Sequence, residues 1–170
     1  TIDMITIGRK GAASARKMGV NLIASFTDMT NNVSFEEVLP IGRMIIDEYT
    51  SGSYDKVVLG YTDFVSAITQ NASLLELLPL GTPDQIEGLG SVNKNEDEVV
   101  DTQDMREYIF EPSAEDVLDR ILPRLIETMM YQAVLESAAS EHSARMMAMR
   151  NASDSASDMI DSLTFTYNQA

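Results

Sequence analysis

The chain has 170 residues, 44% of them apolar, and a formal net charge of −15 with no cysteine. Such a charge argues against binding to nucleic acid or to an anionic membrane surface, because no cationic run could neutralise a series of phosphates. The lack of cysteine excludes disulfides, thiolate zinc sites and cysteine nucleophiles, and the lack of a run of about 18 apolar residues excludes a membrane span.

The first fifty residues alternate between strand and helix patterns. Residues 2–7 predict a strand, residues 10–18 a short helix closed by Gly19, and residues 20–26 a second strand. Ser34 and Glu37 have the spacing of a capping box, so a helix should begin there and stop near Gly52. Pro40 predicts that this helix starts late or bends.

A further strand and an apolar segment complete the first 80 residues. Residues 55–61 form the clearest buried strand, which residues 64–68 are expected to extend, and residues 74–80 form an apolar run closed by turn signals. The alternation over 1–80 predicts a small, partly parallel α/β domain with helices on the faces of its sheet.

Residues 81–112 are predicted to be an acidic linker that includes a short strand-like run at residues 108–110. Between Asp84 and Glu111 there are nine acidic residues against only Lys94 and Arg106. A solvated linker is the interpretation that this composition favours.

Residues 113–170 are predicted to be one long helix. Ser113 followed by Asp116 is typical of a helix N-terminus, and the segment from Ala114 to Ala170 has no glycine and one proline. Its length would be roughly 85 Å at 1.5 Å per residue, too long to lie wholly on the α/β domain. Pro123 is expected to kink the helix or to divide off its first segment.

Apolar residues recur along this helix with the 3-4 spacing of a coiled coil. Ten of the fourteen positions in the predicted seam are apolar. The seam positions are Leu125, Thr128, Gln132, Leu135, Ala139, His142, Met146, Met149, Ser153, Ala156, Ile160, Leu163, Tyr167 and Ala170. The methionines do not all fall on this seam, which indicates a second apolar face. Because the chain has no second helix of matching length, the coiled-coil partner must come from outside this sequence.

The sequence offers no convincing active site. The single histidine, His142, lies on the seam, and one histidine without cysteine cannot build the usual zinc site. The turn Gly8–Gly11 carries two cations that could meet an anion, but it lacks the spacing of a dinucleotide-binding motif and is interpreted as a strand-to-helix turn. No catalytic residue, metal site or cofactor is therefore predicted.

The run Ser140–Asp154 closely resembles the C-terminal helix of the gamma subunit of F-type ATP synthases. Further segments resemble other parts of that subunit in the same order, namely Ile7–Gly11, Asp55–Leu59, Leu77–Leu80, Tyr108–Pro112 and Tyr131–Ala133. The resemblance implies a small Rossmann-like sheet domain inserted between two terminal helices that wind into an antiparallel coiled coil. It also implies a fragment that lacks the N-terminal helix and the extreme C-terminus.

By this resemblance the chain is the non-catalytic central stalk that couples proton-driven rotation to nucleotide-affinity changes in the beta subunits. The implied partners are the alpha, beta and epsilon subunits and the membrane c-ring, on the inner face of an energy-transducing membrane, bacterial or mitochondrial. Glu141, Arg145 and Met149 would face the alpha/beta ring, and Tyr108 and Glu111 would lie near the c-ring and epsilon. An intrahelical ion pair between Glu141 and Arg145 is the plainer interpretation, and both can hold.

Two other interpretations explain parts of the sequence. In a homodimeric coiled-coil scaffold with an α/β head the seam would pair with itself, which the polar seam residues Gln132, His142 and Ser153 make less favourable. A small α/β enzyme with a helical tail would need catalytic residues that the sequence lacks.

Overall fold

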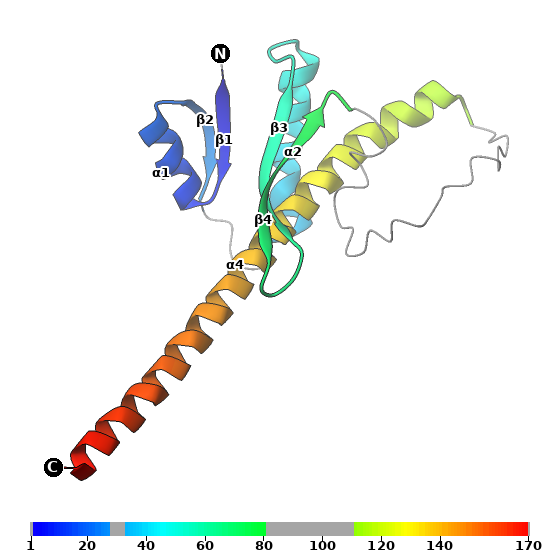
Figure 1. The fold of residues 1–170 in the computed structure, drawn as a ribbon. Helices are drawn as coiled ribbons and strands as arrows, with labels where there is room; N and C mark the ends of the chain where they lie inside the picture. Colours follow the sequence, from blue (N-terminus) through cyan, green and yellow to red (C-terminus); the bar gives the residue numbers. More distant parts are fainter. Residues whose placement is uncertain (1, 28–32, 81–110, 170) are drawn as a thin grey trace. The chain divides into compact units, whose positions relative to one another are not determined.

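The N-terminal segment forms a parallel strand pair connected by a helix. The computed structural model describes residues 2–27, 33–80 and 111–169 (Figure 1). β1 (Asp3–Ile7) and β2 (Asn21–Phe26) pair in parallel, with Asp3 opposite Asn21, and α1 (Arg9–Met18) makes the crossover that a parallel pair requires.

Small residues and a C-terminal glycine determine how α1 packs and ends. Its Ala12 and Ala15 are buried, so the helix can lie close to β1 and β2. Gly19 has a left-handed φ of 69°, and the N–H groups of Gly19 and Val20 donate to the carbonyls of Arg16 and Ala15. This is a Schellman motif, which satisfies carbonyls at the end of the helix, and it confirms the predicted helix end.

Contacts divide the chain into two units, Thr1–Ile41 and Gly42–Ala170, and the division falls inside α2 (Phe35–Thr50). At the start of α2 the Glu37 carboxylate accepts the Ser34 N–H at 3.2 Å, the return half of the predicted capping box. The expected late start at Pro40 is wrong, because α2 begins at Phe35 and contains the proline.

The second unit contains a hairpin and a long helix. β3 (Val57–Phe64) and β4 (Gln70–Leu78) pair antiparallel, with Phe64 opposite Gln70. The predicted extension of β3 through residues 64–68 is confirmed for Phe64 and wrong for the rest, since residues 65–69 connect the two strands and the Ser66 N–H donates to the Thr69 carbonyl.

α4 runs unbroken from Ala114 to Gln169. Ser113 caps it, since its hydroxyl accepts the Asp116 N–H at 3.1 Å. The predicted division at Pro123 is wrong. A proline leaves the carbonyl four residues earlier, here that of Asp119, without its helical partner, and residues 119–121 are exposed, so water can solvate that carbonyl.

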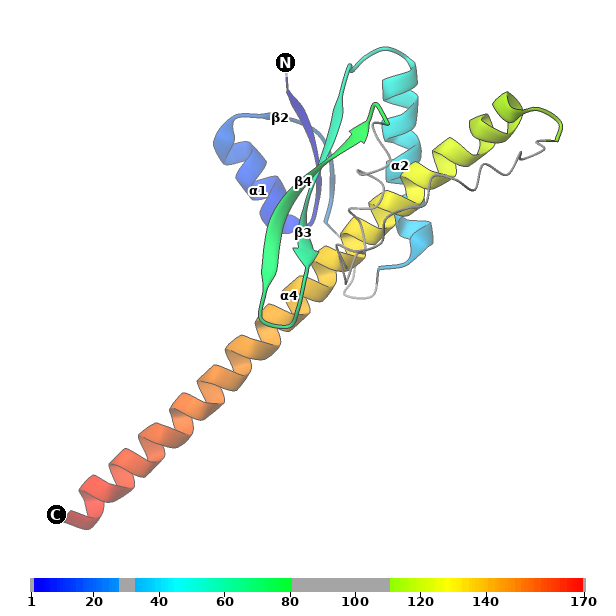
Figure 2. The same cartoon turned by 45° about the vertical axis from the view of Figure 1, so that its right-hand side comes forward.

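α4 packs against β3 and then extends beyond the hairpin, as both views show (Figures 1 and 2). The core of the second unit is made of apolar side chains from the hairpin and from the first half of α4. Its buried residues are Leu75, Leu77, Leu78, Ile126, Met129, Met130 and Ala133. Met129 and Met130 therefore belong to a second apolar face of the helix, as the sequence indicates.

The predicted fold class, a mixed α/β chain with small sheets and a long C-terminal helix, is confirmed. Among the described residues the strands form two separate pairs rather than one Rossmann-like sheet. The linker at 81–110, with its strand-like run, lies outside the described residues. The predicted boundaries at residues 80 and 112 stay predictions.

Candidate functional site

The C-terminal half of α4 leaves its side chains uncovered on every side. Every residue from Ala148 to Gln169 is exposed. Large apolar residues are included, with Ile160 and Leu163 each 63% exposed and Tyr167 83%. A helix that is amphipathic in sequence gains most of its stability from packing that face against a partner, so this half of α4 is the candidate interaction surface.

One face of α4 is fixed to β3 and the residues that follow it by three serines. Ser137 Oγ accepts the Thr62 N–H at 3.1 Å, Ser140 Oγ donates to the Thr62 carbonyl at 3.4 Å, and Ser143 Oγ donates to the Ala67 carbonyl at 2.8 Å. Ser140 and Ser143 are buried. These side-chain to backbone bonds fix the rotation of α4 about its own axis relative to the hairpin.

Replacing Ser143 by alanine should lower the free energy of unfolding by about 0.5 to 1 kcal/mol, because a buried hydrogen bond is lost while helix propensity improves. Chemical denaturation measures the change. Ser157→Ala is the matched control, since the Ser157 hydroxyl bonds only to its own helix at the Ser153 carbonyl and is exposed. An equal loss in both variants would contradict the role assigned to Ser143.

The predicted seam lies beside the face of α4 that carries these serines. At 100° per residue the seam positions before Met149 point on average roughly 110° away from the mean direction of the three serines, and Ser143 is the serine nearest to the seam. The site residues predicted for the seam, all classed as exposed, are Leu135, Ala139, His142, Met146, Ala156, Ile160, Leu163 and Tyr167. The structure brings them to one uncovered side, and their role in a coiled coil stays a prediction.

Glu141, Arg145 and Met149 form a row of residues one helical turn apart that reaches the seam at Met149. Arg145 Nη2 lies 2.6 Å from Glu141 Oε1, so the ion pair considered from the sequence is present. Arg145 Nη1 also lies 3.4 Å from His142 Nδ1. Both charged side chains are exposed, so the pair contributes only about 0.3–0.5 kcal/mol. The ion pair instead holds the Arg145 guanidinium in one position on the surface of the helix.

The two residues predicted for the other end of the stalk are less defined. Glu111 is exposed just before α4 begins. Tyr108 lies outside the described residues. Their contact with a partner stays a prediction.

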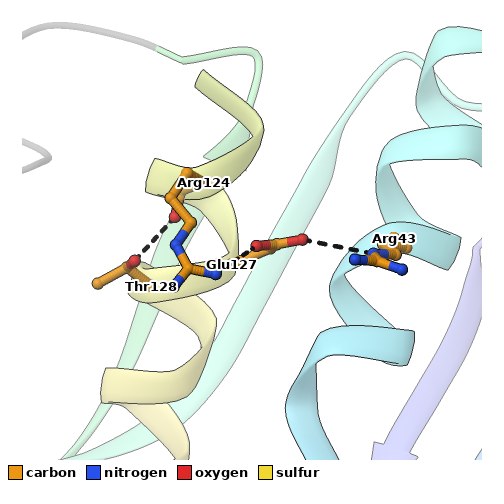
Figure 3. A network of polar contacts seen from close by, with 4 residues as sticks. All are labelled: Arg43, Arg124, Glu127 and Thr128. Carbon is orange, nitrogen blue, oxygen red and sulfur yellow. Dashed lines mark hydrogen bonds and ion pairs between the residues drawn. The ribbon is translucent and has the colours of Figure 1, made fainter. Parts of the chain in front are cut away.

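A buried carboxylate between α2 and α4 was not predicted from the sequence. Glu127 is 8% exposed and lies between two arginines, with its Oε1 3.7 Å from Arg43 Nε and its Oε2 3.3 Å from Arg124 Nη1 (Figure 3). Gly42 permits the approach, because a Cβ there would lie 3.3 Å from Glu127 Cγ. The spacing of Arg124 and Glu127 was visible in the sequence, whereas their proximity to α2 depends on the fold.

Tyr61 lies on β3 and is half-buried. Burial raises the pKa of its phenol, and the carboxylates of Glu136 and Asp63 add to the rise. The folded state therefore holds this proton more tightly than the unfolded chain does. Below pH of about 10 the phenol is protonated in both states, and the stability it contributes is lost as the pH rises beyond that value.

Replacing Tyr61 by phenylalanine should therefore reduce the loss of thermal stability between neutral and strongly alkaline pH. Differential scanning calorimetry across that range measures the difference from the parent chain. Tyr167→Phe, at a residue 83% exposed, is the control and should leave the pH dependence unchanged. If the two variants behave alike, the environment assigned to Tyr61 is wrong.

Within residues 2–27, 33–80 and 111–169, no three side chains of His, Cys, Asp or Glu gather in a way that could hold a metal ion. None of the helices described there has the length and apolarity that crossing a membrane requires.

Comparison with known proteins identifies relatives over the full chain. A family model described as ATP synthase matches residues 1–170. An ATP synthase gamma chain from Symbiobacterium thermophilum is 42% identical over 167 residues, which is 98% of this chain and 53% of that protein. One from Xanthomonas campestris is 39% identical over 169 residues, 99% of this chain and 54% of its own length. The chain thus spans about half the length of the curated relatives it matches.

Two solved structures share the fold. The central stalk and c-ring of the Tetrahymena thermophila mitochondrial ATP synthase matches with a TM-score of 0.60 and 26% identity, over 88% of this chain and 60% of that one. The rotor of the Euglena gracilis mitochondrial ATP synthase matches with a TM-score of 0.55 over 97% of this chain and 60% of that one. At 19% identity, the second match bears on the fold alone.

Proposed function

This chain belongs to the ATP synthase family, and from that premise we propose that it is part of a gamma subunit, the central stalk of the rotor. It would couple proton-driven rotation to changes of nucleotide affinity in the beta subunits. The observation that carries the proposal is the uncovered C-terminal half of α4, which has an apolar side and no partner among the described residues.

A second helix would cover that apolar side. The relatives are nearly twice as long as this chain, which leaves room for a helix that winds antiparallel around α4. Ala139 and Ala156 on the seam would let such a helix approach closely, and the methionines there can adapt to an irregular surface. The packing of α4 on β3 would meanwhile keep the β3–β4 hairpin from turning around the shaft.

Rotation by this route requires no chemistry in the chain itself. A shaft that contacts the beta subunits differently at each angle stabilises different conformations in them, which is a coupling of binding free energies. The subunit would thus be non-catalytic, with alpha, beta and epsilon subunits and the c-ring as partners. It would belong to the membrane-bound complex as a peripheral part, on the bacterial cytoplasmic or mitochondrial matrix side.

The homodimeric scaffold is not favoured. Family model, curated relatives and the Tetrahymena stalk structure all point to the ATP synthase. The polar seam residues Gln132, His142 and Ser153 also suit a different partner better than a copy of the same helix.

Glu141, Arg145 and Met149 should matter in the assembled complex and little in the free chain. In the full-length protein assembled with alpha and beta subunits, we expect Arg145→Glu with Met149→Lys to lower ATP-driven rotation at least about tenfold, since an interfacial charge left without its partner costs about 2–5 kcal/mol. The free chain should keep its unfolding free energy within about 0.5 kcal/mol.

The matched control reverses charge on the opposite side of the same helix. Asp154→Lys with Asp158→Lys alters two exposed residues that do not lie in the row. If this control lowers rotation as much as the row variant does, the assignment of the row to the alpha/beta ring fails. If the unmodified full-length protein forms no complex with alpha and beta subunits, the rotor proposal itself fails.

A further inference from the structure

The helix α1 is a cationic exception in an acidic chain. Between Asp3 and Asp28 the sequence contains Arg9, Lys10, Arg16 and Lys17 and no acidic residue, although the chain as a whole carries a charge of −15. All four cations belong to α1 and all four are exposed. A local potential of the opposite sign to the rest of the molecule attracts a partner of the opposite charge.

The four cations share one side of α1. At 100° per residue they fall within an arc of roughly 120° centred on Ala13. The buried Ala12 and Ala15, which face the strand pair, lie outside that arc. Ala13 is exposed, so a small side chain separates the two arginines from the two lysines.

None of these cations takes part in an ion pair with another described residue. The four ion pairs found in the described part of the chain use Arg43, Lys56, Arg124 and Arg145. The α1 cations also have no carboxylate on their own helix to neutralise them. Their charge is therefore available to a partner.

The spacing of the cations matches a second helix. Arg9 and Arg16 are seven residues apart, and so are Lys10 and Lys17. This is the heptad repeat with which charged rows flank the contact line of two packed helices. Ala13 lies on that line, where a small side chain lets the helices approach.

We propose that this face of α1 docks an acidic α-helical segment of a partner protein, lying lengthwise over Ala13 with its carboxylates seven residues apart. The two arginines suit this partner because a planar guanidinium binds a carboxylate through two parallel hydrogen bonds. An anionic bilayer fits less well, because lipid headgroups move freely in its plane and hold no fixed spacing that would match the two heptad rows. The inference rests on the first unit alone and does not depend on the rotor assignment.

The test uses the 170-residue chain and a stapled two-heptad helical peptide with glutamates seven residues apart. Fluorescence anisotropy should show binding that weakens as salt increases. Arg9→Gln with Arg16→Gln should weaken it at least about tenfold at low ionic strength, since removing two charged contacts of this kind costs more than about 1.4 kcal/mol. Glutamine preserves helix propensity, and circular dichroism checks that the variant is folded.

Three controls make the outcome decisive. Arg120→Gln with Arg150→Gln removes the same charge from exposed positions of α4 and should leave binding unchanged. A peptide of the same composition with its glutamates five residues apart should bind at least about threefold less tightly, since it cannot match the heptad rows. Vesicles that contain phosphatidylglycerol should not retain the chain. Equal losses in both arginine pairs, equal binding of both peptides, or retention on vesicles without peptide binding would each overturn the proposal.

Discussion

Replacing Met130 by alanine should destabilise the chain by about 2–5 kcal/mol, the usual cost of emptying a fully packed core position. Met130 is 2% exposed and is among the largest fully buried side chains of the described residues. This part of α4 contacts β3. Three nearby residues of the helix, Ile126, Met129 and Ala133, are also buried. Denaturant unfolding, monitored by circular dichroism, measures the change.

Met159→Ala on the same helix is the matched control. Met159 is 65% exposed, so the change should alter the free energy of unfolding by less than about 0.5 kcal/mol, as surface substitutions do. The contrast between the two variants tests whether α4 has a packed half and an uncovered half. Equal losses would show that the C-terminal half is packed in the free chain.

Supplying a partner helix should stabilise the chain and end its self-association. The free chain exposes apolar residues on the seam, including Met146, Ile160 and Leu163, and should self-associate through them. When the second helix proposed to wind around α4 is fused or co-expressed, burying these side chains at about 1.5–3 kcal/mol each should exceed the cost of ordering that helix. A net gain of about 4 kcal/mol would raise Tm by roughly 10 °C.

Light scattering and thermal unfolding measure the two effects together. Ile160→Asp with Leu163→Asp, on the seam, should abolish both the stabilisation and the self-association. Asn151→Asp with Ser162→Asp adds the same charge on the opposite side of α4 and should preserve both. A chain that stays monomeric alone, or that gains nothing from the added helix, would contradict the need for a partner.

Local patterns predicted the elements because their causes are local. The glycine at the end of α1, the capping residues Ser34 and Ser113, and the heptad spacing all act within a few residues. The predicted late start at Pro40 and the predicted division at Pro123 are wrong for a related reason. A proline weakens a helix only by a fixed local amount, and packing or solvation of the neighbouring carbonyls can offset that amount.

The candidate site could be predicted only in part. The heptad pattern identified the seam because its residues are apolar. The off-seam methionines indicated a second apolar face, whereas the serines that contact β3 and the residues after it are polar and add nothing to an apolar period. The Arg43–Glu127 contact joins residues that are far apart in the chain, and no local spacing indicates it. The cationic face of α1 was not predicted either. The chain as a whole is acidic, and the four cations share one side only because this segment is a helix.

Co-purification of the full-length protein with ATP synthase alpha and beta subunits tests the central claim most directly. Co-expressed with these subunits and purified through a tag on the protein, it should recover a complex of all three that hydrolyses ATP and rotates an attached probe. The seam variant Ile160→Asp with Leu163→Asp should lose that complex, and the off-seam variant should retain it. A folded full-length protein recovered free of alpha and beta subunits would contradict the account.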